Sequence, residues 1–244
     1  MIEIKNLTKS FGNNLVWEDV TFDIQDGETV AIIGRSGCGK SVLVKHFNAL
    51  IYPDSGDVII DGKCVFELEY VELRKMRQRF GILFQSSALF DSINTFENVA
   101  FPLRYFSDLG EEEIRNKVEE SLEMVNLGGV SSKSTSELSG GMRRRVALAR
   151  AIVLAPDFLI YDEPTSGLDP QTSEEINKLI IAMAENLKIT SIVVTHDIHS
   201  VLEVADRVAF LDSQELCWHG TVEEMRQSSN RRLLDFITAS EYQI

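Results

Sequence analysis

The octapeptide GRSGCGKS at residues 34–41 combines three glycines with one lysine, a composition suited to holding phosphate. It follows the apolar run TVAII and precedes VLVKHFNAL, so it links a predicted buried strand to a predicted helix. Glycines let consecutive backbone N–H groups point at one anion, and the helix N-terminus adds its positive dipole end. The spacing G-x-x-x-x-G-K-S therefore predicts a phosphate-binding loop, with an ordinary strand–turn–helix junction as the alternative.

Within this loop, Lys40 is expected to hold the β- and γ-phosphates of a nucleotide, and Ser41 is expected to ligate Mg²⁺. The predicted nucleotide-binding residues of the loop are Gly34, Arg35, Ser36, Gly37, Cys38, Gly39, Lys40 and Ser41.

Two adjacent carboxylates, Asp162 and Glu163, follow the apolar run FLIY at residues 158–161. Buried carboxylates are unfavourable unless a cation meets them, which favours a chemical role here. Asp162 is placed to reach Mg²⁺ through water, and Glu163 points to the other side of the strand as a general base for an attacking water. The alternative is that both acids cap the following turn.

His196 follows another apolar run, SIVVT, at the carboxyl end of a predicted strand, where open α/β sheets bind ligands. Its ring could contact the γ-phosphate and orient the water near Glu163, although a structural histidine is the alternative. Lys40, Glu163 and His196 are thus the predicted catalytic residues. The other three histidines have no such setting and are assigned no role.

A second pattern suited to anions is LSGGMRRRVALARAI at residues 138–152, far along the chain from Lys40. Ser139, Gly140 and Gly141 open a predicted helix there, and a hydroxyl beside free N–H groups suits a phosphate. Its arginines are read as a solvated or ion-paired helix face rather than as a site for an anionic partner.

These residues need a framework of strands and helices to position them. IEIKN, VTFDI, TVAII and GDVIIDG read as strands near the N-terminus and predict an antiparallel part there. DFLIYDE and TSIVVTH predict a buried parallel sheet, with PQTSEEINKLIIAMAENL as a helix between them. Between about residues 86 and 156 strand signals are absent, and EEEIRNKVEESLEMVNL and the segment after LSGG have helical spacing. The sequence therefore predicts an α/β core with a helical insertion.

Taken together, these motifs resemble those of the ATP-binding cassette (ABC) ATPases, over practically the whole chain. The resemblance implies a Q-loop at Gln85, which would help to bind nucleotide and Mg²⁺ with Ser41 and Asp162, and a D-loop at Asp169. It also implies that Phe11 stacks on adenine, with core packing as the alternative. Met142 departs from the family, which usually has glutamine after the signature glycines.

The same resemblance implies a fold with a P-loop NTPase (RecA-like) core, an antiparallel β subdomain and an inserted α-helical signature subdomain. The expected organisation is one domain, residues 1–244. Residues 1–85 and 156–213 form the core, residues 86–155 the helical subdomain, and residues 214–244 a C-terminal tail that is expected to contact a partner subunit. Two copies are expected to pair head to tail, so that the Ser139 turn of one copy completes the ATP site of the other.

Partners are also implied. Six of the thirteen phenylalanines lie at residues 80–106, around Gln85, where the family docks an integral membrane permease, so the segment predicts an apolar groove, with pure core packing as the alternative. Within the family the chain looks most like the Mce-associated (Mla-type) lipid transport ATPases, which would add an Mce-type lipid-binding protein. A polar amino-acid importer ATPase and a non-transport regulatory ATPase remain alternatives.

Composition narrows the remaining possibilities. The formal charge of −14 argues against a nucleic-acid partner, because an acidic surface repels polyanions. The apolar runs are far shorter than the about 18 residues that a membrane span needs, and no secretory signal opens the chain, so a cytoplasmic protein is expected. The family resemblance implies, more closely, a peripheral location at the cytoplasmic face of the inner membrane. The three scattered cysteines suggest reduced thiols rather than disulfides or a zinc site.

Overall fold

The structure is a computed structural model, and it describes residues 1–240. The last four residues of the predicted tail, 241–244, lie outside the described residues. In this part of the chain no helix combines the length and the apolar composition that crossing a membrane would require.

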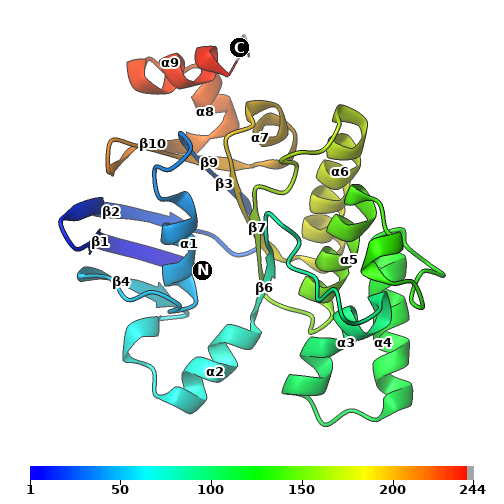
Figure 1. Ribbon diagram of the computed structural model, residues 1–244. Helices are drawn as coiled ribbons and strands as arrows, with labels where there is room; N and C mark the ends of the chain where they lie inside the picture. The colour runs from blue at the N-terminus through cyan, green and yellow to red at the C-terminus, as the bar shows by residue number, and fades with distance from the viewer. Residues whose placement is uncertain (241–244) are drawn as a thin grey trace.

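Six strands form the central sheet, in the order β10-β9-β3-β8-β7-β6. All neighbours are parallel except β9 and β10. The strands are β3 (Thr29–Ile33), β6 (Phe80–Leu83), β7 (Phe158–Asp162), β8 (Thr190–Thr195), β9 (Arg207–Asp212) and β10 (Glu215–Thr221). Ile33 pairs with Thr195 and Asp162 pairs with Val194, so β3, β7 and β8 end at the same edge of the sheet. The loops that follow these three strands therefore meet there (Figure 1).

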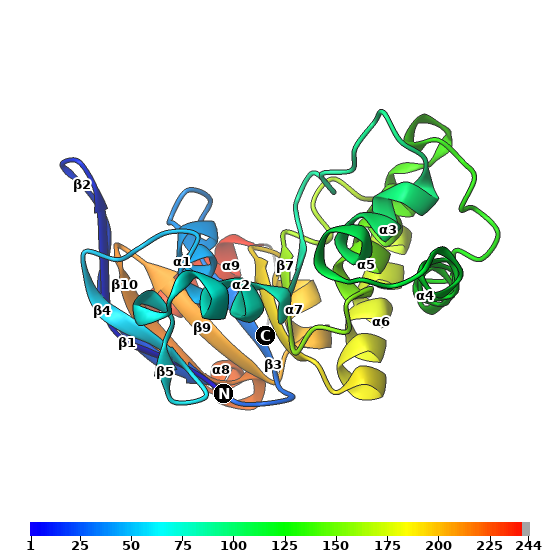
Figure 2. The same ribbon diagram turned by 90° about the horizontal axis from the view of Figure 1, so that it is seen from below.

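A second, antiparallel sheet has the order β2-β1-β4-β5. Its strands are β1 (Ile2–Phe11), β2 (Asn14–Ile24), β4 (Ser55–Ile60) and β5 (Lys63–Cys64). Helix α1 (Lys40–Phe47) lies against both sheets, because Leu43 and Phe47 share one core with Trp17 of the second sheet and Ile160 of the first. Figure 2 shows this β-rich lobe beside a separate helical lobe.

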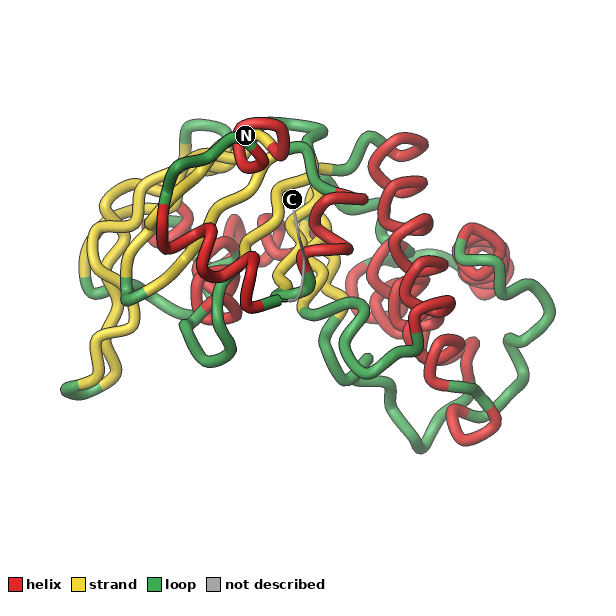
Figure 3. Tube along the Cα trace, turned by 90° about the horizontal axis from the view of Figure 1, so that it is seen from above, coloured by secondary structure: helices red, strands yellow, loops and turns green. Residues whose placement is uncertain are grey.

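The helical lobe packs against the opposite face of β7. Along this strand Phe158 and Ile160 join the core around α1, while Leu159 and Tyr161 join the core of the helical lobe, as the period of two of a β-strand requires. The helices of this lobe are α3 (Thr95–Phe106), α4 (Glu111–Met124), α5 (Gly140–Ile152) and α6 (Pro170–Leu187), with a 3-10 turn at Thr135–Glu137. Figure 3 shows how the helices gather on this side of the strands.

Three short helices cover the outer end of the central sheet: α7 (Ile198–Val204), α8 (Val222–Arg226) and α9 (Arg231–Ala239). Leu233, Phe236 and Ile237 of α9 pack with Ile33 and Phe210 of the sheet. The described part of the predicted tail thus packs on the rest of its own chain through one face of α9. Its contact with a partner subunit stays a prediction.

The predicted fold class is confirmed, since the chain has an α/β P-loop core, an antiparallel subdomain and a helical lobe. Helix α6 coincides with the predicted helix, and β3 with TVAII. The grouping of TVAII with the antiparallel part is wrong, because β3 pairs in parallel with β8 and β9. Helix α2 (Tyr70–Gln78), a 3-10 turn at Val65–Glu67 and strand β6 were not singled out from the sequence. The division of the chain at residues 85, 155 and 213 stays a prediction.

Candidate functional site

The loop between β3 and α1 needs glycine at two positions for steric reasons. Gly34 has φ 154°, and a Cβ there would lie 2.3 Å from the carbonyl oxygen of Leu211. Gly39 has φ 91°, and a Cβ there would lie 2.5 Å from Cγ1 of Val16. Only glycine fits such a backbone in such close contact with neighbouring strands, so the glycines of GRSGCGKS shape the loop before any ligand is considered.

Lys40 opens α1 and its side chain folds back over the loop. Its Nζ donates hydrogen bonds to the carbonyl oxygens of Gly34, at 2.8 Å, and Arg35, at 3.1 Å, and lies 3.9 Å from a carboxylate oxygen of Glu163. The residue is only 6% exposed, so its ammonium group is held inside the loop rather than in solvent. A cation in this place suits an anion that enters the loop.

Ser41 and Asp162 are brought together although 121 positions separate them in the chain. The Ser41 hydroxyl donates a hydrogen bond of 3.0 Å to Oδ1 of Asp162. Burial raises the pKa of Asp162, the hydrogen bond from Ser41 opposes this rise, and the neighbouring Glu163 charge adds to it. The pair offers two hard oxygen donors side by side, the kind that Mg²⁺ prefers.

Glu163 and His196 also meet, from the ends of β7 and β8. His196 Nδ1 lies 2.9 Å from Oε2 of Glu163, and the Thr195 hydroxyl lies 3.5 Å from the same oxygen. The backbone N–H of Glu163 donates to the carbonyl oxygen of Val194 at 2.8 Å. A carboxylate with a histidine beside it is an arrangement that can take and pass a proton.

Two further predicted site residues, Gln85 and Phe11, come from other elements. Gln85 follows β6, and its Nε2 donates to the Ser166 hydroxyl at 3.5 Å rather than contacting Ser41 or Asp162. Phe11 ends β1 and is 49% exposed, so the alternative of core packing is wrong. The Lys9 ammonium lies 5.3 Å from the centre of the Phe11 ring. An exposed aromatic face leaves room for stacking, which stays a prediction.

The Ser139 turn lies on the helical lobe, whereas the Lys40 loop lies on the β-rich lobe (Figure 1). Ser139 caps α5, since its hydroxyl accepts a hydrogen bond of 3.2 Å from the N–H of Met142. Gly141 packs so closely on α6 that a Cβ would lie 2.7 Å from Cγ2 of Thr172. No hydrogen bond or ion pair within residues 1–240 joins this turn to residues 34–41.

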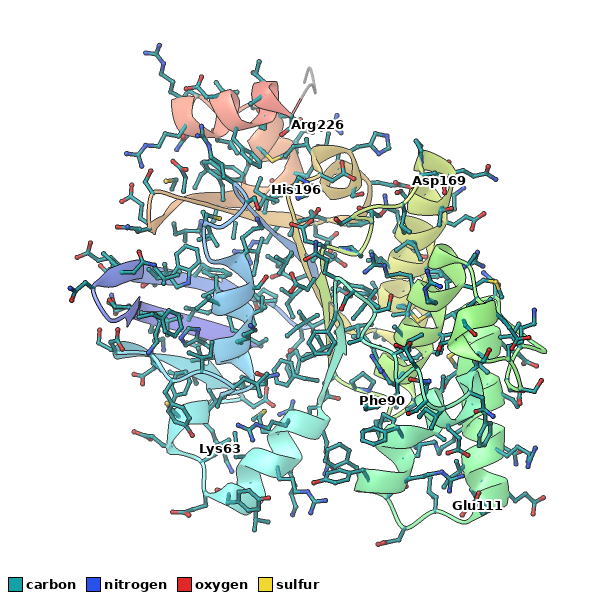
Figure 4. All side chains as sticks on the ribbon, viewed as in Figure 1. Lys63, Phe90, Glu111, Asp169, His196 and Arg226 are labelled. Atoms are coloured by element: carbon teal, nitrogen blue, oxygen red, sulfur yellow. The ribbon has the colours of Figure 1, made fainter. Side chains whose placement is uncertain are left out.

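Met142 and Asp169 lie near this turn. The Met142 side chain packs against the core of the helical lobe. Asp169 caps α6 by accepting a hydrogen bond of 3.0 Å from the N–H of Thr172. Figure 4 shows Asp169 at the upper end of the helical lobe, with His196 nearer the centre of the molecule.

The interpretation of the arginines of α5 as a solvated or ion-paired face is wrong for two of them. Arg144 is buried and donates to the carbonyl oxygens of Phe84, Gln85 and Ser166. Arg150 donates to the carbonyl oxygens of Ser87 and Ala88, at 2.8 Å and 2.7 Å. Burial without a carboxylate partner lowers the pKa of both guanidinium groups.

The buried arginine could have been found from helical spacing. Three consecutive residues of a helix point in directions about 100° apart, so RRR cannot be solvated as a whole on a helix that is buried on one side. Arg145 does form the expected ion pair, with Glu175 at 2.8 Å. Arg144 instead ties the segment after β6 to the loop after Glu163.

An apolar groove lies below this segment, between α3 and β6. It encloses about 310 Å³, and its lining includes Phe80, Phe84, Phe90, Phe101, Pro102 and Phe106. Phe84, Phe90 and Phe101 are each 41–45% exposed, which excludes pure core packing for these three rings. In Figure 4 Phe90 lies well below His196 and Asp169. Phe84, however, also lines a smaller pocket with Ser41 and Asp162, so one end of the groove adjoins the site.

A glycine loop with an inward lysine, a serine–aspartate pair, and a glutamate–histidine pair at the ends of parallel strands define a P-loop ATPase of the cassette type. A family model described as "ABC transporter" matches residues 17–166, more than half of the chain. The chain belongs to the ABC transporter family, as an ATP-binding subunit that hydrolyses ATP.

Curated relatives with different printed functions match almost equally well. The intermembrane phospholipid transport ATP-binding protein MlaF of Haemophilus influenzae is 43% identical over 97% of this chain and 90% of its own length. The probable ribonucleotide transport ATP-binding protein mkl of Mycobacterium leprae is 42% identical over 97% and 68%. The methionine import ATP-binding protein MetN of Clostridium tetani is 41% identical over 92% and 70%.

Solved structures agree with this assignment. A dimeric, post-hydrolysis ATP-binding cassette bound to ADP and Pi matches with a TM-score of 0.82 and 33% identity, over 91% of this chain and 99% of that chain. The match covers both lobes, so the fold of the whole cassette is shared.

Proposed function

We propose that two copies of this chain close head to tail around two ATP molecules and drive a membrane permease that moves phospholipid or another lipid across the cell envelope. The observation that carries the dimer is the separation of two phosphate-suited elements, Lys40 with its loop and the Ser139 turn, onto different lobes of one chain. One chain would use each element on a different nucleotide.

In this proposal the loop at residues 34–41 wraps the phosphates, and Lys40 exchanges its backbone carbonyl partners for phosphate oxygens. Glu163 takes a proton from the attacking water, and His196 holds the carboxylate and the water in line. Ser139 and the two following N–H groups of the second copy meet the γ-phosphate. Phe11 stacks on the adenine. Loss of the γ-phosphate removes the bridge between the copies.

Mg²⁺ is proposed as the cofactor, because the Ser41 hydroxyl and the Asp162 carboxylate fit its preference for oxygen ligands. When bound, it would neutralise charge that develops on the phosphates. Gln85 would have to leave Ser166 to contribute its amide oxygen. No cluster of three or more His, Cys, Asp or Glu side chains in the described part of the chain could hold a metal alone, so the remaining ligands would come from ATP and water.

The permease is proposed to dock in the apolar groove at α3, which would hold the chain at the cytoplasmic face of the inner membrane. The exposed rings of Phe90 and Phe101 lie 5.0 Å apart, centre to centre, and give a helix from a partner an apolar surface to bury. Arg144 connects this region to the active site, because it donates hydrogen bonds both to the carbonyl oxygen of Gln85, after β6, and to that of Ser166, in the loop after β7.

Lipid cargo rests on similarity alone, chiefly to MlaF over nearly the full length of both chains. An Mce-type lipid-binding protein would then belong to the same assembly. The similarity to MetN supports a second candidate, an amino-acid importer ATPase. A regulatory ATPase without cargo is the third.

The dimer is tested with Glu163→Gln, which keeps the shape of the side chain but removes the base. In ATP and Mg²⁺ this variant is expected to accumulate as a dimer on size exclusion with light scattering, whereas the wild type hydrolyses its ATP and returns to monomer. A variant that stays monomeric would contradict the proposed site.

Cargo is tested by purifying the tagged chain from its native membranes in mild detergent. Copurification of a permease, a lipid-binding subunit and phospholipid supports lipid transport. A permease with a solute-binding protein specific for an amino acid supports the importer instead, and a membrane partner without any cargo-binding subunit supports the regulator.

A further inference from the structure

A buried polar cluster lies behind the catalytic pair, and no step described so far uses it. It joins four segments: the loop after β7, helix α6, the loop after β8, and helix α7. Its members are Thr165, Asn177, Asp197, Ser200 and Glu203. A cavity of about 900 Å³ is lined both by these residues and by Glu163 and His196.

Asn177 is the member contributed by α6, and it is 1% exposed. Its Nδ2 donates to the Ser200 hydroxyl at 3.1 Å and to Oε2 of Glu203 at 2.7 Å. Its Oδ1 is buried and accepts no hydrogen bond from any described residue. A buried acceptor without a partner costs about 1–3 kcal/mol, so an asparagine lowers the stability of this packed face.

The other buried residues of α6 show what stability alone would favour at this position. Ile176, Leu179, Ile180 and Met183 fill the same side of the helix. An apolar residue in place of Asn177 would remove the unpaired Oδ1, but it would also remove the two hydrogen bonds that Nδ2 donates. A polar residue with an unpaired buried acceptor, in the wall of the cavity that Glu163 and His196 also line, is a candidate for a functional role.

The contacts of Asn177 lead to both catalytic residues. Ser200, which accepts from Asn177, donates a hydrogen bond of 2.6 Å to Oδ2 of Asp197, the residue directly after His196. Thr165, two residues after Glu163, lies 3.5 Å from the same oxygen of Asp197 and 3.4 Å from the Ser200 hydroxyl. The loops that carry the base and the histidine therefore share one anchor on α6.

We infer that Asn177 and Ser200 are positioning residues that hold the Glu163 and His196 loops in register for ATP hydrolysis. The inference rests on the proposed roles of Glu163 and His196. Neither Asn177 nor Ser200 contacts the Lys40 loop, so they act on the chemical step and leave ATP binding unchanged.

The test measures ATPase kinetics and thermal unfolding for Asn177→Leu, Ser200→Ala and the double variant. Each single variant is expected to lower kcat about 10-fold with KM for ATP within about twofold of wild type, because small misplacements of catalytic groups slow chemistry. Asn177→Leu is expected to unfold close to the wild-type temperature, since it removes the unpaired acceptor together with the two hydrogen bonds from Nδ2. The double variant should be no slower than the slower single variant, because both break one chain of contacts.

Ser191→Ala is the matched control: Ser191 is also fully buried, on β8, but makes none of these contacts, and the change should leave kcat at the wild-type level. If Asn177→Leu fails to fold, Ser200→Ala alone decides. A kcat within twofold of wild type overturns the inference, and so does a kcat loss accompanied by a matching rise in KM. Glu163→Gln distinguishes a failure of this inference from a failure of the proposed function. An active Glu163→Gln variant contradicts the proposed site itself. An inactive Glu163→Gln variant, together with Asn177 and Ser200 variants of normal activity, contradicts only this inference.

Discussion

Glu163 has a backbone conformation that residues with a side chain rarely adopt. Its φ is 50°, in the left-handed region, which costs about 1–2 kcal/mol for a residue other than glycine. The hydrogen bond from its N–H to Val194 holds the turn. The backbone is left-handed at this residue, and the carboxylate faces His196 and Lys40. Other non-glycine residues of the described chain also have a positive φ, so the contacts of Glu163, and not its φ alone, identify the site.

Asp162 also lowers stability at its position, which gives a prediction at the residue scale. Burial is the main cause that raises its pKa, so the folded protein without ligand disfavours the charged carboxylate. Asp162→Asn keeps an oxygen that can accept from Ser41 but removes the charge. We expect the variant to unfold about 2–4 °C above wild type at pH 7, corresponding to about 1 kcal/mol, with ATPase activity lost.

The pH dependence of this difference follows from the sign of the shift. A carboxyl group with a raised folded-state pKa binds its proton more readily in the folded than in the unfolded chain, so its destabilising effect is present at neutral pH and disappears as the pH falls through the folded pKa. The gap in unfolding temperature between Asp162→Asn and wild type should therefore close in acid. A gap that widens in acid would contradict the assignment, and calorimetry across pH 4–8 measures it.

Lys40 gives a second prediction at this scale. Its ammonium is buried, but its hydrogen-bond partners are carbonyl oxygens of its own loop, so truncation removes little structure. Lys40→Ala is expected to reduce ATPase activity to background and to weaken ATP binding, while the fold by circular dichroism is kept. Lys63→Ala is the control, because Lys63 is exposed and forms an ion pair with Glu72, away from the loop. Near-normal turnover in Lys40→Ala would exclude the assigned role.

Residues with a strong local signal could be predicted from the sequence, and residues whose role depends on tertiary contacts could not. Glycine spacing identified Lys40 and Ser41, and strand ends identified Asp162, Glu163 and His196, which the structure gathers at one edge. Asn177 has no such signal, because one asparagine in an amphipathic helix looks like a surface position until its burial is known. The hydrogen bond between Gln85 and Ser166 could not be predicted from the sequence either.

At the scale of elements, periodicity decided which segments were predicted well. Helix α6 is long and amphipathic, with its cap at Asp169 and a proline directly after it, so both its type and its start can be predicted. Strand β6 has only four residues and includes Gly81, whose Cβ would lie 2.3 Å from the carbonyl oxygen of Ala151. A short strand with a glycine gives little signal, although close packing on α5 explains that glycine.

Helix α3 gives the prediction at this scale, because aromatic side chains on one face of it are exposed. Tyr105 is 62% exposed and Phe101 is 45% exposed. Phe101→Glu places a charge on the proposed docking surface and is expected to lower copurification of the permease at least about 10-fold, since burying an unpaired charge is strongly unfavourable. ATPase activity of the isolated chain should stay within about twofold of wild type.

Leu187→Glu supplies the control for this experiment. Leu187 is 38% exposed, at the end of α6, and does not line the groove. Equal loss of the permease in both variants would show that a general effect of the added charge, rather than docking at α3, is responsible. Unchanged copurification with Phe101→Glu would place the permease elsewhere on the molecule.

At the scale of the whole molecule, the two lobes present the Lys40 loop and the Ser139 turn as separate surfaces, which the proposed head-to-tail pairing would bring together. Closure of two such copies works against their charge. Each chain has a formal charge of −14, and each ATP adds further negative charge to the interface. Long-range repulsion between the copies must therefore be overcome by the local contacts at the nucleotides.

This balance predicts an unusual salt dependence for dimer formation. The Debye length falls from about 30 Å at 0.01 M ionic strength to about 8 Å at 0.15 M, which screens repulsion between the acidic surfaces but leaves contacts buried around ATP almost unaffected. With Glu163→Gln in saturating ATP and Mg²⁺, sedimentation equilibrium should show a dimer dissociation constant at least about threefold lower at 0.15 M than at 0.01 M. A dimer that weakens steadily with salt would mean that opposite charges at the facing surfaces, and not the net charge, govern closure.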